Sequence, residues 1–122
     1  SDLCHRLAAR GPCRLMLAAR DGARLGQLAA ELQLEHPKHP PNVLCHALDA
    51  RNAGEVDEAF AAAAAEFRNL NGAVNLCGSI LLKPAHLTTD QEFADTLAVN
   101  LVTAFNVLRA AARAMTGGGS VV

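Results

Sequence analysis

Three short apolar runs alternate with segments of helical periodicity along this chain, and that order limits the fold it can adopt. The runs occupy residues 14–19, 43–48 and 72–76, and residues that favour turns flank each of them. The first two are almost entirely apolar and do not alternate with polar residues, which is typical of strands buried on both faces of a parallel sheet. Strands separated by helices pair in parallel through crossover connections. The sequence therefore predicts an α/β fold.

The helical segments carry recognisable signals at their ends. A helix is predicted over residues 1–10, and Asp21 is placed to cap the next one. Thr89-x-x-Glu92 forms a capping box that begins a helical region reaching residue 115, after which residues 121–122 begin a further strand. The apolar residues at helical spacing in the two helices between are Leu25, Leu28, Ala29 and Leu32, then Val56, Ala59, Phe60, Ala63 and Phe67.

Charge and composition argue against several classes of partner. Eleven basic and twelve acidic residues leave a formal net charge of −1, which provides no field for attracting nucleic acid. No apolar run approaches the roughly 20 residues that span a bilayer, so we expect a cytoplasmic protein without a membrane segment. The four cysteines have no C-x-x-C spacing, which favours reduced, buried thiols. His36 and His39 lack a third ligand at usable spacing, so no metal site is predicted.

Two motifs in the second half of the chain resemble those of one enzyme family. Asn75-Leu-Cys-Gly78 ends the third predicted strand, and Asn100 lies seven residues after Phe93 within Val-Asn-Leu. This order resembles the short-chain dehydrogenase/reductase family, whose first motif is usually Asn-Asn-Ala-Gly, so that Leu76 departs from it. The resemblance covers nearly the whole chain.

The resemblance implies one incomplete domain over residues 1–122. Its fold would be a partial doubly wound, Rossmann-like parallel sheet that binds a dinucleotide. The family's first, central strand and its Gly-rich phosphate loop would come before Ser1, and the catalytic half with Ser and Tyr-x-x-x-Lys would come after Val122. The chain contains no Tyr. We therefore expect a fragment that is inactive by itself.

The resemblance also implies which residues contact the cofactor. Arg20, with Arg24 one turn later, would bind the 2′-phosphate of NADP(H), since a guanidinium forms paired hydrogen bonds with phosphate. Asp49 would accept from the adenine amino group, with the backbone of Ala50 alongside. The alternative for Arg20 is a solvated strand-end residue, and the alternative for Asp49 is a turn or N-cap residue.

Three further residues would lie on the nicotinamide side. Asn75 and Gly78 would end the strand beside the cofactor, and Asn100 would be the one member of the catalytic set present. In the family, this Asn distorts the helix locally, and its carbonyl holds a water of the proton relay. A helical Asn is otherwise usually a solvent-facing residue. Lys83 and His86 show no partner in sequence and are interpreted as surface residues of a loop.

The implied function is hydride transfer between NADP(H) and a small carbonyl or alcohol substrate. The alternative is a non-catalytic binding or scaffold protein with the same fold. A homo-oligomer is compatible with either function. We expect one stripe of the last helix to cover the sheet and the opposite side, at Ala104 and Ala111, to serve dimerisation. The residues of the stripe are Leu101, Phe105, Leu108, Ala112 and Met115.

Overall fold

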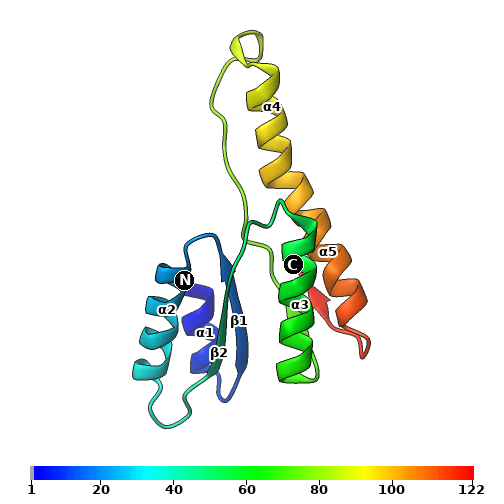
Figure 1. Cartoon of the computed structure of the whole chain (residues 1–122). Coiled ribbons are helices and arrows are strands. Elements are labelled where there is room, and N and C mark those ends of the chain that lie inside the picture. Colours follow the sequence, from blue (N-terminus) through cyan, green and yellow to red (C-terminus); the bar gives the residue numbers. More distant parts are fainter. Residues whose placement is uncertain (1) are drawn as a thin grey trace. The chain divides into compact units, whose positions relative to one another are not determined.

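The computed structural model describes residues 2–122, so Ser1 and its predicted place in the first helix lie outside the described residues. Two compact units make up the chain, one ending at Leu48 and one running from Asp49 to Val122. Two parallel strands and two helices form the first unit, with Leu17 opposite Cys45 in the sheet (Figure 1). Its elements are α1 (Asp2–Ala9), β1 (Arg14–Ala19), α2 (Gly22–Glu35) and β2 (Asn42–Ala47).

The core of the first unit joins both helices to one face of this sheet. Its buried members are Ala8, Leu17, Leu25 and Leu32. Asp21 caps α2 as expected, because its carboxylate accepts from the Arg24 N–H at 3.0 Å. The prediction that both strands are buried on both faces is wrong, since Leu17 is the only buried residue in either strand. The helices of this unit cover only the face that carries Leu17, and the sheet has just two strands.

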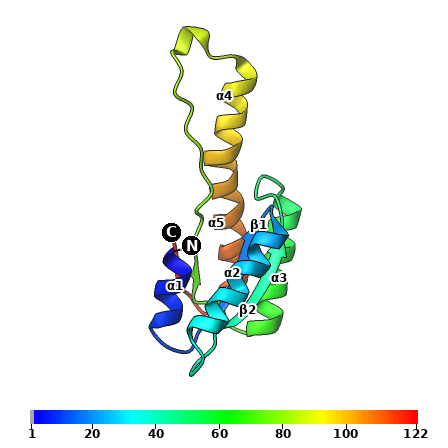
Figure 2. The same cartoon turned by 90° about the vertical axis from the view of Figure 1, so that its left-hand side faces the viewer.

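The second unit contains a long helical rod beside a second helix and a short sheet (Figures 1 and 2). The rod changes from α-helical to π-helical geometry and back along its length. The elements are α3 (Ala53–Phe67), β3 (Gly72–Ala73), the 3₁₀ turn η1 (Ala85–Leu87), α4 (Asp90–Leu97), the π-helical turn η2 (Ala98–Val102), α5 (Thr103–Ala114) and β4 (Ser120–Val121).

All paired strands run in parallel, which confirms the α/β prediction. β3 is shorter than the predicted strand over residues 72–76, although the Asn75 N–H still donates to the Val122 carbonyl at 2.7 Å. Among residues 2–122, β1 pairs only with β2 and β3 only with β4, so the strands form two separate sheets. Two separate parallel sheets agree with the predicted partial doubly wound sheet, which lacks its first, central strand.

The predicted burial of α5 is wrong in detail. Leu101, Phe105 and Leu108 were expected to cover the sheet, yet each is more than half exposed. Ala111, expected on a free dimerisation side, is fully buried. The helix instead packs against α3, where small side chains allow close approach. Its buried residues are Thr103, Asn106, Ala110 and Ala111.

Within residues 2–122 the four cysteines form no disulfide, but they are not buried as expected. Cys4 and Cys13 are partly buried, and Cys45 and Cys77 are exposed. Burial, with a smaller contribution from Cys4, raises the pKa of the Cys13 thiol. Within residues 2–122, no helix combines the length and the hydrophobicity that crossing a bilayer requires.

Candidate functional site

The Asn100 side chain holds the backbone that follows β3 from both sides. Its Oδ1 accepts from the Ser79 N–H at 3.0 Å, and its Nδ2 donates to the Ser79 carbonyl at 3.0 Å and to the Ser79 Oγ at 3.3 Å. The same Nδ2 donates to the Thr96 carbonyl, one turn earlier in the rod, at 2.9 Å. We call this set of bonds the Asn100 clamp. It fixes Ser79 against the helical rod.

Gly78 lies directly before the clamped residue and leaves room for it. A Cβ built at Gly78 would be 3.3 Å from the Asn100 Oδ1, closer than most real Cβ contacts. The sequence prediction named both positions separately from the family pattern, and the structure leaves less than ordinary contact space for a side chain between them. A side chain at position 78 would therefore press on the amide that forms the clamp.

Asn100 sits at the centre of the π-helical turn, where the helix departs from regular geometry. The Thr103 N–H donates to the Ala98 carbonyl, five residues back, which leaves the Val99 carbonyl without its usual backbone donor. The Thr103 hydroxyl takes that place at 2.6 Å. Asn75 Nδ2 in turn donates to Thr103 Oγ1 at 3.5 Å, so Asn75 is tied to the same distorted turn. Such single π-helical turns are frequent at functional sites.

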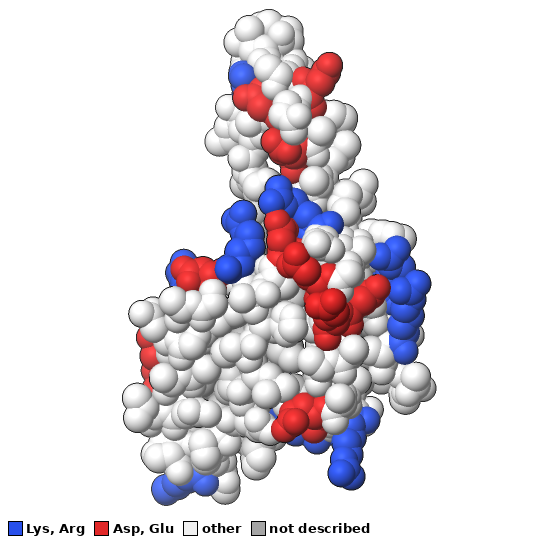
Figure 3. Space-filling view, in the orientation of Figure 1, with Lys and Arg blue, Asp and Glu red and all other residues white. Residues whose placement is uncertain are grey.

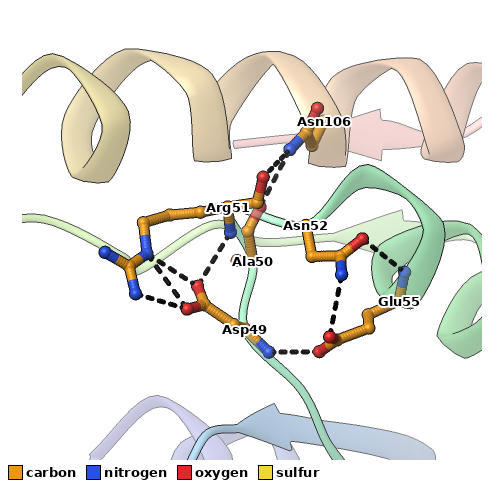
Figure 4. A network of polar contacts seen from close by, with 6 residues as sticks. All are labelled: Asp49, Ala50, Arg51, Asn52, Glu55 and Asn106. Atoms are coloured by element: carbon orange, nitrogen blue, oxygen red, sulfur yellow. Dashed lines mark hydrogen bonds and ion pairs between the residues drawn. The ribbon is translucent and has the colours of Figure 1, made fainter. Parts of the chain in front are cut away.

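A second cluster forms at the turn from Asp49 to Asn52 (Figure 4). The Asp49 carboxylate accepts from the Arg51 N–H at 3.0 Å and from the Arg51 guanidinium through Nε and Nη2. The Glu55 carboxylate accepts from the Asp49 N–H at 2.7 Å. Asn52 caps α3 and donates through Nδ2 to Glu55 at 2.9 Å. Asp49 is thus a turn residue, and its carboxylate is also one-third exposed.

One backbone N–H of this turn has no hydrogen-bond acceptor within residues 2–122. Leu48 donates to the Ala19 carbonyl, Asn52 to the Asp49 carbonyl, and Asp49 and Arg51 to the carboxylates given above. Within the part of the chain that the structure describes, the Ala50 N–H alone among residues 48–52 has no partner. An N–H donor and a partly exposed carboxylate acceptor therefore belong to consecutive residues of this turn.

Arg20 and Arg24 belong to the first unit, at the end of β1 and in the first turns of α2. Both are exposed, and neither guanidinium forms a hydrogen bond or ion pair with another residue in 2–122. Both are therefore available to an anion. Lys, Arg, Asp and Glu are interspersed over the face shown in Figure 3, and neither sign covers it continuously.

Lys83 is an exposed loop residue as predicted, but it has a partner that the sequence did not reveal. Its ammonium donates to both carboxylate oxygens of Glu92 at 2.9 and 2.8 Å. These bonds, together with the Thr89 N–H, lower the pKa of Glu92 to about 2. The predicted capping box between Thr89 and Glu92 is confirmed. The pair ties the segment after Ser79 to the start of α4.

The sequence interpretation missed four participants: Arg51, Ser79, Thr103 and Asn106. Thr103 and Asn106 are buried polar residues at 2% and 4% exposure, on the face of α5 that also carries alanines. In the sequence, these two polar residues lie three positions apart on a helix face of small residues. That spacing could have indicated that both are buried and hydrogen-bonded. Ser79 and Arg51 act through backbone groups or a neighbouring side chain, which composition does not reveal.

Comparison with known proteins identifies the lineage. The family model described as Enoyl-(Acyl carrier protein) reductase matches residues 2–122. The short-chain dehydrogenase/reductase aba4 of Botryotinia fuckeliana (strain B05.10) is 34% identical over 120 residues, which are 95% of this chain and 45% of that protein. The chain belongs to the short-chain dehydrogenase/reductase family. Members of this family use nicotinamide cofactors, bind small-molecule substrates and often form oligomers.

Solved structures of short-chain dehydrogenases/reductases agree with this assignment. A short-chain type dehydrogenase/reductase from Mycobacterium ulcerans is 25% identical, with a TM-score of 0.89 over 98% of this chain and 44% of that one. An alcohol dehydrogenase from the archaeon Thermococcus sibiricus, complexed with 5-hydroxy-NADP, is 28% identical, with a TM-score of 0.83 over 98% of this chain and 50% of that one. The chain spans about half the length of the relatives it matches.

Proposed function

We propose that the protein containing this chain transfers a hydride between NADP(H) and a small carbonyl or alcohol substrate. The observation that carries the proposal is the turn at Asp49 and Ala50, where one available N–H stands beside a partly exposed carboxylate. Adenine presents a ring nitrogen that accepts and an amino group that donates, so this pair matches its edge. We also propose that residues 1–122 form part of one dinucleotide-binding domain.

The turn of the second unit offers groups that suit adenine, and the first unit offers two exposed arginines that suit a phosphate. In the proposal, Ala50 donates to the adenine ring, Asp49 accepts from the adenine amino group, and Arg20 with Arg24 binds the 2′-phosphate. The bound cofactor would supply or accept the hydride at its nicotinamide ring. Asn75, Gly78 and Asn100 would shape the nicotinamide side, with the clamp holding the backbone at Ser79 in place.

The preference for NADP(H) over NAD(H) rests on Arg20 and Arg24. Both guanidinium groups are exposed and unpaired within residues 2–122, and a bidentate contact to phosphate is their strongest mode of binding. The Thermococcus sibiricus relative is complexed with 5-hydroxy-NADP, which supports a cofactor of this type.

Titration of the full-length protein that contains this chain tests the preference. NADPH should bind more tightly than NADH, and Arg20→Ala should weaken NADPH binding about 10- to 100-fold, since hydrogen bonds to charged groups contribute about 1.5–3 kcal/mol. Arg10→Ala removes an exposed arginine of the same unit and should change neither affinity. Equal affinities for the two cofactors in the wild type would refute the NADP(H) assignment.

The 122-residue chain by itself should not catalyse the reaction. It contains no Tyr, and the family's general acid or base is a Tyr. An assay of NADPH oxidation with a panel of aldehydes and ketones should give no turnover above background. Turnover by the isolated chain would refute this part of the proposal. A cytoplasmic location also belongs to the proposal, because four cysteines without a disulfide in residues 2–122 suit a reducing compartment.

A second candidate function is association without catalysis. Leu101, Phe105 and Leu108 form an exposed apolar row on the rod, and such rows mark contact surfaces. In this reading, the protein binds NADPH or a second copy of itself but turns over no substrate. Sedimentation of the full-length protein, combined with the turnover assay, separates the two functions.

A further inference from the structure

Asn106 connects the rod to the turn that carries the adenine-binding candidates. Its side chain is only 4% exposed and projects from α5 toward that turn (Figure 4). Nδ2 donates to the Ala50 carbonyl at 3.0 Å and to the Arg51 carbonyl at 3.2 Å. A single amide group therefore holds two consecutive peptide units of the turn.

The remaining peptide units of the turn are held by the turn itself. The Asp49 carbonyl accepts from the Asn52 N–H at 2.8 Å, and this fixes the peptide plane that also contains the Ala50 N–H. The Asp49 Oδ1 accepts from the Arg51 N–H at 3.0 Å, which sets the direction of the carboxylate. These local bonds belong to a short surface turn, where water competes with them. The bonds from Asn106 come from a buried side chain on a packed helix and are better protected.

We propose that Asn106 is a positioning residue for adenine recognition. By holding the carbonyls of Ala50 and Arg51, it keeps the free Ala50 N–H and the Asp49 carboxylate in the relative arrangement that an adenine edge requires. Ordering a turn before the ligand arrives removes an entropic cost from binding. Asn106 touches neither the cofactor nor the substrate in this scheme, and it acts through the backbone.

The inference rests on the proposed function, because it presumes an adenine-containing cofactor. It goes beyond that function in assigning a role to a buried residue of a helix that the adenine does not contact. It also predicts a specific chemical signature. Loss of Asn106 should impair discrimination between adenine and a base with the opposite hydrogen-bonding edge, and not merely lower affinity.

The probes are NADPH and its deamino analogue, which carries hypoxanthine in place of adenine. Hypoxanthine presents an oxygen and a ring N–H where adenine presents an amino group and a ring acceptor. The full-length wild type should therefore bind NADPH about tenfold or more tightly than the analogue, as expected for two lost hydrogen bonds. Fluorescence titration gives both Kd values.

Asn106→Ala should reduce this discrimination ratio to about threefold or less, because the turn is then free to move. Asn106→Ser is the second variant, to be used if the first does not fold. Its hydroxyl bonds within its own helix and does not reach the two carbonyls. Val56→Ala is the control, since Val56 is 2% exposed on α3 and its loss lowers stability without removing a polar contact to the turn.

The outcomes separate the inference from the proposed function. A wild-type ratio near one, or unchanged ratios in both Asn106 variants, would overturn the positioning role while NADPH binding still stood. An equal loss of discrimination in the Val56 control would overturn it as well, because general destabilisation would then account for the effect. Failure of the wild type to bind either dinucleotide would overturn the proposed function, and the inference with it.

Discussion

Replacement of Asn100 by Ala should release the backbone at Ser79 from the helical rod. The variant loses three hydrogen bonds to Ser79 and one to the Thr96 carbonyl. Because Asn100 is exposed and water can replace its partners, each bond falls at the low end of the usual range, about 0.5 kcal/mol. The four bonds together contribute about 2 kcal/mol by the same measure.

Alanine also favours the helix more than asparagine does, which returns about 0.5 kcal/mol. The net loss is then about 1.5 kcal/mol, close to a factor of ten in a local equilibrium. Amide hydrogen exchange reports such local opening directly. We therefore expect the Ser79 N–H to exchange about tenfold faster in Asn100→Ala than in the wild type, under native conditions in the full-length protein.

A control on the same rod separates the clamp from general loosening of the helix. Gln91 donates to Asp95 at 2.9 Å on the exposed side of α4, so Gln91→Ala removes a bond within the helix and leaves Ser79 untouched. Exchange at Ser79 should not change in this variant. Wild-type exchange at Ser79 as rapid as in an unstructured peptide, or an unchanged rate in Asn100→Ala, would refute the clamp.

Three other perturbations follow from the second unit. Gly78→Ala should disturb the Asn100 amide and speed exchange in the segment after β3, as measured by hydrogen exchange; an unchanged rate would show that the amide adjusts freely. Lys83→Met should lower stability at pH 7. Because the pKa of Glu92 is depressed to about 2 from an ordinary 4.5, this difference should vanish as the pH falls from 4.5 toward 2, whereas a constant difference in urea melts would contradict the pairing. Phe105→Glu should weaken any self-association in sedimentation experiments, since Phe105 is 55% exposed, and an unchanged oligomeric state would exclude this face.

The order of helices and strands could be predicted from the sequence because the apolar runs, the helical periodicity and the capping residues all indicated the same boundaries. The strand at Arg14–Ala19 has the predicted bounds, and Asp21 and Thr89 cap their helices as expected. The burial of α5 could not be predicted in the same way. Their hydrophobicity predicts that Phe105 and Leu108 are buried. The contact of α5 with α3 is instead made through alanines and two polar residues, because small side chains allow the two helices to approach closely.

The candidate site was predictable only where residue type itself carries the role. Asn100 and Gly78 were named from their motifs, and the structure places the Asn100 amide where a side chain at position 78 would press on it. The free Ala50 N–H depends on which neighbouring donors are already satisfied, and Asn106 reaches the turn across 55 or more positions of sequence. Long-range hydrogen bonds of this kind leave no periodic trace in a single sequence.

The π-helical turn η2 has a consequence for how insertions and deletions act on this chain. Such a turn accommodates one residue more than an α-helical turn, and each residue of an α-helix rotates the direction of its side chain by about 100°. Removal of a single residue from Ala98–Val102 would restore a regular helix and swing every side chain of α4 by about that angle relative to α5. The presence of one additional residue in η2 therefore determines which face of α4 is directed toward the segment that follows Ser79.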